Sequence, residues 1–191
     1  MSFFGPPPPP PEPSAEAYRL PPWIGSPDNV LGAGVPLHLL LARTDDVAVA
    51  ITGATAFPTG VSFDLAIRLR EARGHADFLS PVLLRALGGD VEELFRFGVQ
   101  LADGSKAVYE EATPFGDQEP VGPVLASAGG GGGGRSWNFA VWLWPLPPPG
   151  PLAFVVQWPA KGIPETRQEA DAGSIREAAE RAEVLWPDGQ I

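Results

Sequence analysis

The stretch that decides the fold is VSFDLAIRLR, residues 61–70. Apolar side chains occupy its odd positions from Val61 to Leu69, whereas Asp64 and Arg68 are among the residues at even positions. An alternation with a period of two predicts a strand with one buried and one solvated face, which is typical of antiparallel sheets. This segment therefore predicts a β protein whose sheet buries one face in the core and exposes the other to solvent.

The same period recurs on both sides of this segment. Asp103 and Gly104 offer a tight hairpin turn, and we expect the last two strands to pair as a second hairpin. The glycine run 129–134 predicts a flexible surface loop between two strands. The further expected strands are 37–43, 47–57, 95–101, 105–110, 123–128, 137–144 and 152–158.

Helical signals are few. Ser80, Pro81 and Gly88 resemble the start and stop of a short helix. Asp171 is placed to cap a terminal helix whose apolar positions, from Ile175 to Leu185, recur at spacings of three and four.

These elements predict an all-β fold, an antiparallel β-sandwich of immunoglobulin-like type with a C-terminal α-helix; a jelly roll or a partly open barrel is the alternative. The expected organisation is a disordered Pro-rich arm (1–13), an extended, irregular lead-in (14–35), the sandwich (36–170), and a C-terminal helix and tail packed on it (171–191). The arm contains Pro6–Pro11, which favours a polyproline II helix.

Composition excludes several function classes. The chain has 13 Lys and Arg against 23 Asp and Glu, a formal charge of -10, which disfavours nucleic acid and membrane surfaces as partners. The absence of cysteine removes thiol catalysis, disulfides and thiolate metal sites. Neither a signal-peptide pattern nor a spanning apolar run is present, so we expect a cytoplasmic protein.

Catalytic and metal motifs are weak. The segment Gly129–Ser136 approaches a phosphate-binding loop, but an aromatic strand follows it where that motif requires a helix. His38 and His75 stand in no catalytic setting, and Asp64 and Asp117 are isolated carboxylates. We therefore expect no enzyme activity, no metal and no cofactor.

The tryptophans form the strongest binding signal. In the strand 137–144, Trp137 shares a face with core-type residues, whereas Trp142 and Trp144 share the opposite face and need a cover. Candidate covers are the terminal helix, the proline arm, or a partner such as a peptide or a sugar ring. Arg135, at the end of the glycine run, is a candidate anion contact. The expected binding residues are Arg135, Trp137, Trp142 and Trp144.

Two blocks, Phe95–Gly104 and Gly129–Pro159, with the motif WPLPPPGPL at 144–152, resemble a family of uncharacterised bacterial proteins. The resemblance covers about a quarter of the chain directly. That family carries no assigned activity, so the resemblance implies a coherent domain and no particular chemistry.

The leading hypothesis is a non-enzymatic cytoplasmic protein-interaction module. In it, the proline arm and the surface of Trp142 and Trp144 recruit a protein partner or another copy of the chain. The alternative is a ligand-binding β-sandwich in which Trp142, Trp144 and Arg135 hold a carbohydrate or a small anionic ligand.

Overall fold

The computed structural model describes residues 20–71, 94–110 and 118–186. The Pro-rich arm, the expected short helix at 80–88, His75 and Asp117 lie outside these ranges.

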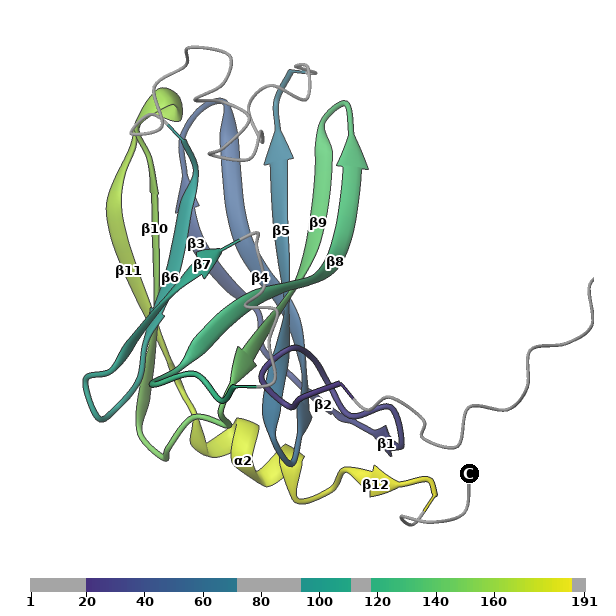
Figure 1. Cartoon of the computed structure of the whole chain (residues 1–191). Coiled ribbons are helices and arrows are strands. Elements are labelled where there is room, and N and C mark those ends of the chain that lie inside the picture. The colour runs from purple at the N-terminus through teal and green to yellow at the C-terminus, as the bar shows by residue number, and fades with distance from the viewer. Residues whose placement is uncertain (1–19, 72–93, 111–117, 187–191) are drawn as a thin grey trace, which may run out of the picture.

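The described chain is dominated by a 10-stranded sheet in the order β11-β10-β6-β7-β8-β9-β5-β4-β2, with β3 also paired to β4. The sheet curls into a half-barrel, so that β3 lies beside β11 although the two strands are not paired (Figure 1). The strands are β2 (Ala33–Val35), β3 (Leu39–Arg43), β4 (Val47–Phe57), β5 (Gly60–Leu69), β6 (Arg96–Gln100), β7 (Lys106–Glu110), β8 (Val124–Gly133), β9 (Ser136–Trp144), β10 (Pro151–Trp158) and β11 (Ile163–Asp171).

The predicted all-β class with a C-terminal helix is confirmed. A single curled sheet replaces the two separate sheets of an immunoglobulin-like sandwich and corresponds to the partly open barrel given as the alternative. The sheet is also mixed, not fully antiparallel. Among the described strands, β7 and β8 run parallel, with Tyr109 opposite Leu125.

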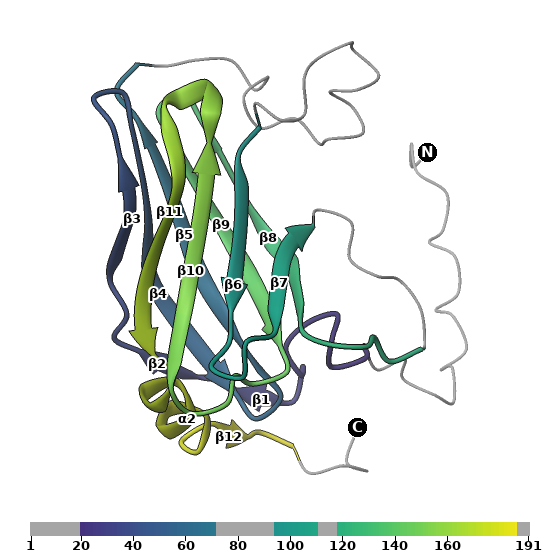
Figure 2. The ribbon, with the colours of Figure 1, turned by 90° about the vertical axis from the view of Figure 1, so that its left-hand side faces the viewer.

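The two halves of the curled sheet face each other around the core (Figure 2). The predicted inward face of β5, from Val61 to Leu69, is buried. Phe63 of β5 meets Phe154 of β10 edge to face, with ring centroids 5.0 Å apart, and Phe97 of β6 stacks on the same ring at 6.4 Å. Apolar packing between facing strands therefore closes the half-barrel.

The prediction that the last two predicted strands, 137–144 and 152–158, pair as a hairpin is wrong. β9 pairs with β5 and β8, whereas β10 pairs with β6 and β11 in the facing half of the sheet. The connection 145–150 contains four prolines, which lack the N–H groups that a tight turn between paired strands uses. Leu146 N–H instead donates to Thr59 O at 3.0 Å, which fixes this connection against the β4–β5 turn.

Most of the glycine run is a strand rather than the expected loop, and only its last residue, Gly134, lies in the turn before β9. After a bulge between Ser127 and Gly129, its residues continue β8 and pair one by one with β9, from Gly129 opposite Ala140 to Gly133 opposite Ser136. The backbones approach closely here, because a Cβ on Gly132 would lie 2.6 Å from the Cα of Trp137. Only glycine fits such an approach, so backbone pairing overrides the loop-like composition.

The C-terminal helix α2 (Gly173–Ala179) is shorter than predicted. Asp171 was the expected N-cap, but the N-cap residue is Ala172, which makes no side-chain capping bond; the Asp171 carboxylate lies one residue earlier and accepts a hydrogen bond from Gly173 N–H at 3.0 Å. Ile175, Ala178 and Ala179 are buried against the end of the half-barrel.

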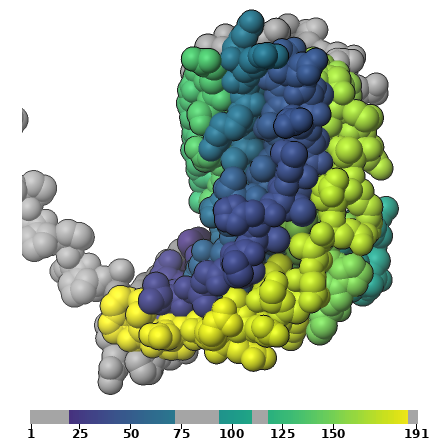
Figure 3. Space-filling model, turned by 180° about the vertical axis from the view of Figure 1, so that it is seen from behind, coloured from purple at the N-terminus to yellow at the C-terminus, as the bar shows by residue number. Residues whose placement is uncertain are grey.

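Beyond α2 the chain is extended and lies along the base of the molecule. β12 (Glu183–Val184) pairs antiparallel with β1 (Val30–Leu31) in a separate small sheet. Figure 3 shows these first and last described segments side by side. This pairing takes the place of the last predicted helical turns, and Leu185 is exposed.

Candidate functional site

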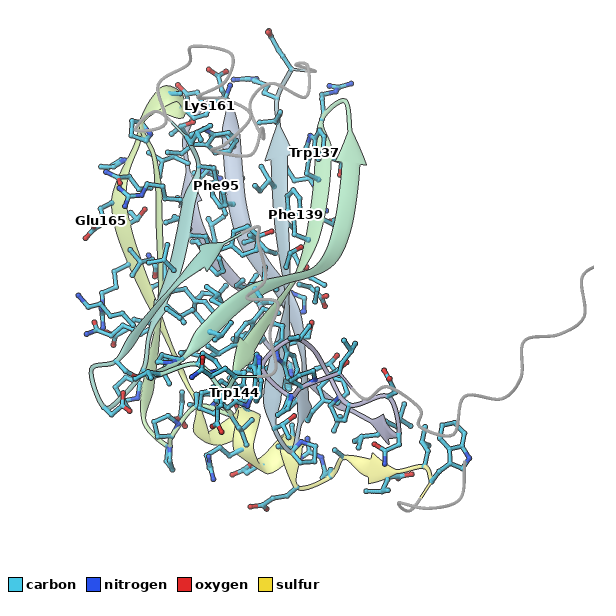
Figure 4. The ribbon with its side chains drawn as sticks, viewed as in Figure 1. Phe95, Trp137, Phe139, Trp144, Lys161 and Glu165 are labelled. Carbon is cyan, nitrogen blue, oxygen red and sulfur yellow. The ribbon has the colours of Figure 1, made fainter. Side chains whose placement is uncertain are left out.

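The four predicted binding residues do not form one site. Arg135 precedes β9, and Trp142 lies near the end of that strand. Trp137 and Trp144 lie at opposite ends of β9 (Figure 4). At about 3.3 Å per residue, Arg135 and Trp144 are roughly 30 Å apart along the strand. A small ligand therefore cannot contact both.

At the first end of β9, both predicted residues make structural contacts. Arg135 is exposed, and its guanidinium donates to Arg70 O at 3.4 Å. Its own carbonyl accepts from Leu69 N–H at 2.9 Å and so extends the ladder of β5. Trp137 points inward, is buried, and stacks on Phe139 with ring centroids 6.3 Å apart.

Trp142 lies on the outer face of β9, as the alternation predicts, but it is fully buried. Its ring meets Phe57 edge to face at 5.7 Å. Gly60 lies directly against the ring, because a Cβ there would be 2.6 Å from Trp142 Cζ2. The indole N–H donates to Pro22 O at 3.0 Å.

The cover of this outer face is the lead-in segment Leu20–Trp23. Trp23 packs edge to face against Trp144 with ring centroids 5.9 Å apart, beside the bond from Trp142 to Pro22. The terminal helix, one of the expected covers, is not the cover, because its apolar side chains pack against the end of the half-barrel. A short segment of the chain itself therefore covers the two tryptophans.

Trp144 is only half-buried, and it lines a groove of about 590 Å³ at the base of the half-barrel. We call this hollow the Trp144 groove. Prolines form much of its wall, and Asp103, Glu119 and Arg176 supply charged groups at its rim. Arg176 is held in place because its guanidinium donates to Pro147 O at 3.1 Å. The proline residues of the wall are Pro120, Pro123, Pro145, Pro148 and Pro149.

Asp103 is ionised at the rim of the Trp144 groove. Its carboxylate accepts hydrogen bonds from the Ser105 hydroxyl at 2.6 Å and from the Ser105 N–H at 2.9 Å. These bonds stabilise the charged form and lower the pKa of Asp103 below its ordinary value. The groove therefore keeps a fixed negative charge on the side of the β6–β7 turn.

Sequence reasoning missed Pro22, Trp23 and Arg176 as parts of this region. The motif LPPW at 20–23 was the available signal, because a proline pair next to tryptophan combines a stiff backbone with a large apolar ring. Without periodicity, however, the motif does not indicate where in the fold it docks.

Two further features concern the described residues only. No group of three or more His, Asp or Glu side chains within them is arranged to hold a metal ion. Their helices include none with the length and apolarity needed to cross a membrane.

Comparisons with protein-family models, with curated proteins and with solved structures found no match for this chain.

Proposed function

We propose that this chain is a non-enzymatic protein-interaction module that binds an extended, proline-containing segment of a partner protein in the Trp144 groove. The observation that carries the proposal is the hydrogen bond of 3.0 Å from the Trp142 indole to Pro22 O. Through it, the outer face of β9 already holds a proline pair of its own chain next to Trp144.

The chemistry of this contact suits proline-rich ligands in general. A polyproline segment has no internal hydrogen bonds, so its carbonyl groups are free to accept, and its rings pack on aromatic faces. An indole supplies both a flat apolar surface and an N–H donor. Because such segments are extended before binding, little conformational entropy is lost when they dock.

The Trp144 groove supplies the adjoining surface. Its volume of about 590 Å³ falls within the range of roughly 300–1,000 Å³ that is typical of ligand sites. Its proline wall is rigid because each proline ring fixes its own φ angle. Arg176 and Glu119 lie at the rim, where they can hydrogen-bond the backbone of a docked segment.

The test uses the indole N–H signals of the six tryptophans in a two-dimensional NMR spectrum of the full chain. A proline-rich peptide is titrated in, with a Gly/Ser peptide of equal length as the ligand control. We expect the signals of Trp144 and Trp23 to shift with the proline peptide, while that of the exposed Trp186 stays in place.

Protein variants distinguish specific binding in the Trp144 groove from nonspecific binding elsewhere on the protein. Trp144→Ala should weaken peptide binding by about tenfold or more, as loss of a hot-spot aromatic does, and Trp186→Ala should not. If Trp144→Ala reduces folding, Trp144→Phe retains an aromatic ring and should bind with intermediate affinity. Equal binding of both peptides, or equal losses in the Trp144 and Trp186 variants, would contradict the proposal.

A carbohydrate is the second candidate ligand of the same groove. The observation in its favour is that a half-buried indole, Trp144, lies among the hydrogen-bonding groups Asp103, Glu119 and Arg176. The apolar face of a sugar ring would stack on the indole, and its hydroxyl groups would bond the charged side chains. Shifts of the Trp144 signal with oligosaccharides, but not with the proline peptide, would favour this candidate.

A further inference from the structure

A second surface hollow lies on the outer face of β6, β7, β10 and β11. The strand registers place Arg167, Val155, Gly98 and Val108 in one row across these four strands. Because Gly98 has no side chain, the row is interrupted between the two valines, and a hollow of about 240 Å³ opens there. Val108 is 58% exposed, so the floor of the hollow is apolar and accessible.

Basic side chains surround this floor. Arg96, Lys106 and Arg167 all line the hollow, and we call it the basic hollow. Gln157 accepts from Arg96 at 3.4 Å, and Gln100 accepts from Arg167 at 2.6 Å, so neutral amides orient two of the three cations.

The positive charge of the basic hollow is only partly balanced. Arg167 also pairs with Glu169 at 3.0 Å. Glu165 lines the hollow at its β11 margin, where it projects outward (Figure 4). Within the described ranges, no carboxylate forms a salt bridge with Arg96 or Lys106. In a chain with a formal charge of -10, this surface is a local exception that attracts anions.

The spacing of the cations defines the ligand. Lys106 lies opposite Gln100, which is four positions along β6 from Arg96. The backbone positions of Arg96 and Lys106 are therefore about 13 Å apart along the strand. In an extended peptide, side chains four positions apart are separated by the same distance of about 13 Å and point to the same side.

We propose that the basic hollow binds an extended acidic segment of a partner protein, with the pattern acidic–x–apolar–x–acidic. One acidic side chain pairs with Arg96 and the other with Lys106. The apolar side chain between them enters the hollow over Gly98, between Val108 and Val155. This surface shares no lining residue with the Trp144 groove, so the proposal is independent of the proposed function.

The test measures fluorescence anisotropy of a labelled peptide with the core Glu-Ser-Leu-Ser-Glu on the full chain at low ionic strength. The matched ligand control has Gln in place of both Glu residues. We expect the Glu peptide to bind at least about tenfold more tightly than the Gln peptide, and its affinity to fall as salt is added.

Protein variants locate the site. Arg96→Glu and Lys106→Glu should each weaken the Glu peptide by about tenfold or more, and Val108→Ser should weaken it by removing the apolar floor. Arg43→Glu is the matched control, since Arg43 is an exposed arginine at the end of β3 that carries the same charge change away from the hollow. All four variants have exposed side chains, so thermal unfolding should be little altered.

Three outcomes would overturn the proposal. The first is equal binding of the Glu and Gln peptides, or no binding of either. The second is an equal loss of affinity for the Glu peptide in Arg43→Glu and Arg96→Glu, which would indicate nonspecific attraction between opposite charges. The third is concentration-dependent self-association that Arg96→Glu abolishes, since this would assign the basic hollow to a second copy of the chain. None of these outcomes depends on Trp144.

Discussion

Phe63 and Phe154 meet edge to face across the interior, with ring centroids 5.0 Å apart and ring planes at 90°. The two residues belong to β5 and β10, which lie in opposite halves of the sheet and share no backbone hydrogen bonds. Their contact therefore helps to keep the half-barrel closed.

Truncation of either ring should be strongly destabilising. Both side chains are fully buried, so Phe63→Ala or Phe154→Ala should lower the free energy of unfolding by about 3–5 kcal/mol. A double-mutant cycle in denaturant should return a coupling of about 0.5–1.5 kcal/mol, the value typical of aromatic pairs. Additive losses would mean that the rings act only through separate burial.

Two neighbouring glycines of β8, Gly131 and Gly132, give a prediction in which one position is the control for the other. A Cβ on Gly132 would lie 2.6 Å from Trp137 Cα, whereas a Cβ on Gly131 would have nothing within 4 Å. Gly132→Ala should therefore force β8 away from β9 and destabilise the protein. Gly131→Ala should be neutral or stabilising by about 0.4–1 kcal/mol, because it restricts the unfolded chain. A flexible loop would tolerate both changes equally, so thermal unfolding of the two variants distinguishes strand from loop.

The sequence predicted strands where one face is buried and the other solvated. β5 is such a strand, since its inward residues pair with the inward residues of β4 and β9. β11 was missed because, after Ile163, none of its residues is buried, so its sequence IPETRQEAD has no apolar face. A strand at the end of the sheet is held mainly by backbone hydrogen bonds to its one neighbour. Such bonds do not require apolar side chains to alternate, so the sequence contains no period-two signal.

The candidate site was harder to predict than the sheet. Alternation correctly placed Trp142 and Trp144 on the face opposite Trp137. Alternation gave no information about the segment that covers them. Leu20–Trp23 is more than a hundred residues away in sequence, and it docks through the Pro22 carbonyl and the ring contact between Trp23 and Trp144. The basic hollow was equally hidden, since Arg96, Lys106 and Arg167 come together only through the register of four strands.

The cover over Trp142 should loosen when its donor is removed. Trp142→Phe deletes the N–H that binds Pro22 O and part of the ring that packs on Phe57. The free energy of unfolding should fall by about 1–3 kcal/mol. Amide exchange should also accelerate at Ile24, whose N–H donates to Pro21 O within the cover.

Trp186→Phe is the matched control for this prediction. Trp186 is 52% exposed, so its replacement should change neither stability nor exchange at Ile24. Unchanged exchange in Trp142→Phe would mean that Trp23, and not the indole bond, holds the cover.

The turn at Asp103 should show the pH dependence of a carboxylate that is stabilised in its ionised form. The Ser105 hydroxyl and N–H both donate to Asp103, and the folded pKa is below the ordinary value. The stabilising contribution is therefore fully present above the pKa of the unfolded chain, and it disappears as the pH falls through the lower, folded pKa. Ser105→Ala removes the hydroxyl, the largest cause of the shift, and should raise the pKa of Asp103 towards its ordinary value. NMR titration of the Asp103 carboxyl carbon measures this change directly.

Ser174→Ala is the matched control, because the hydroxyl that it removes donates to Asp171 O and not to Asp103. This variant should leave the titration of Asp103 unaltered. An Asp103 midpoint that is the same with and without the Ser105 hydroxyl would show that the backbone N–H alone holds the charge.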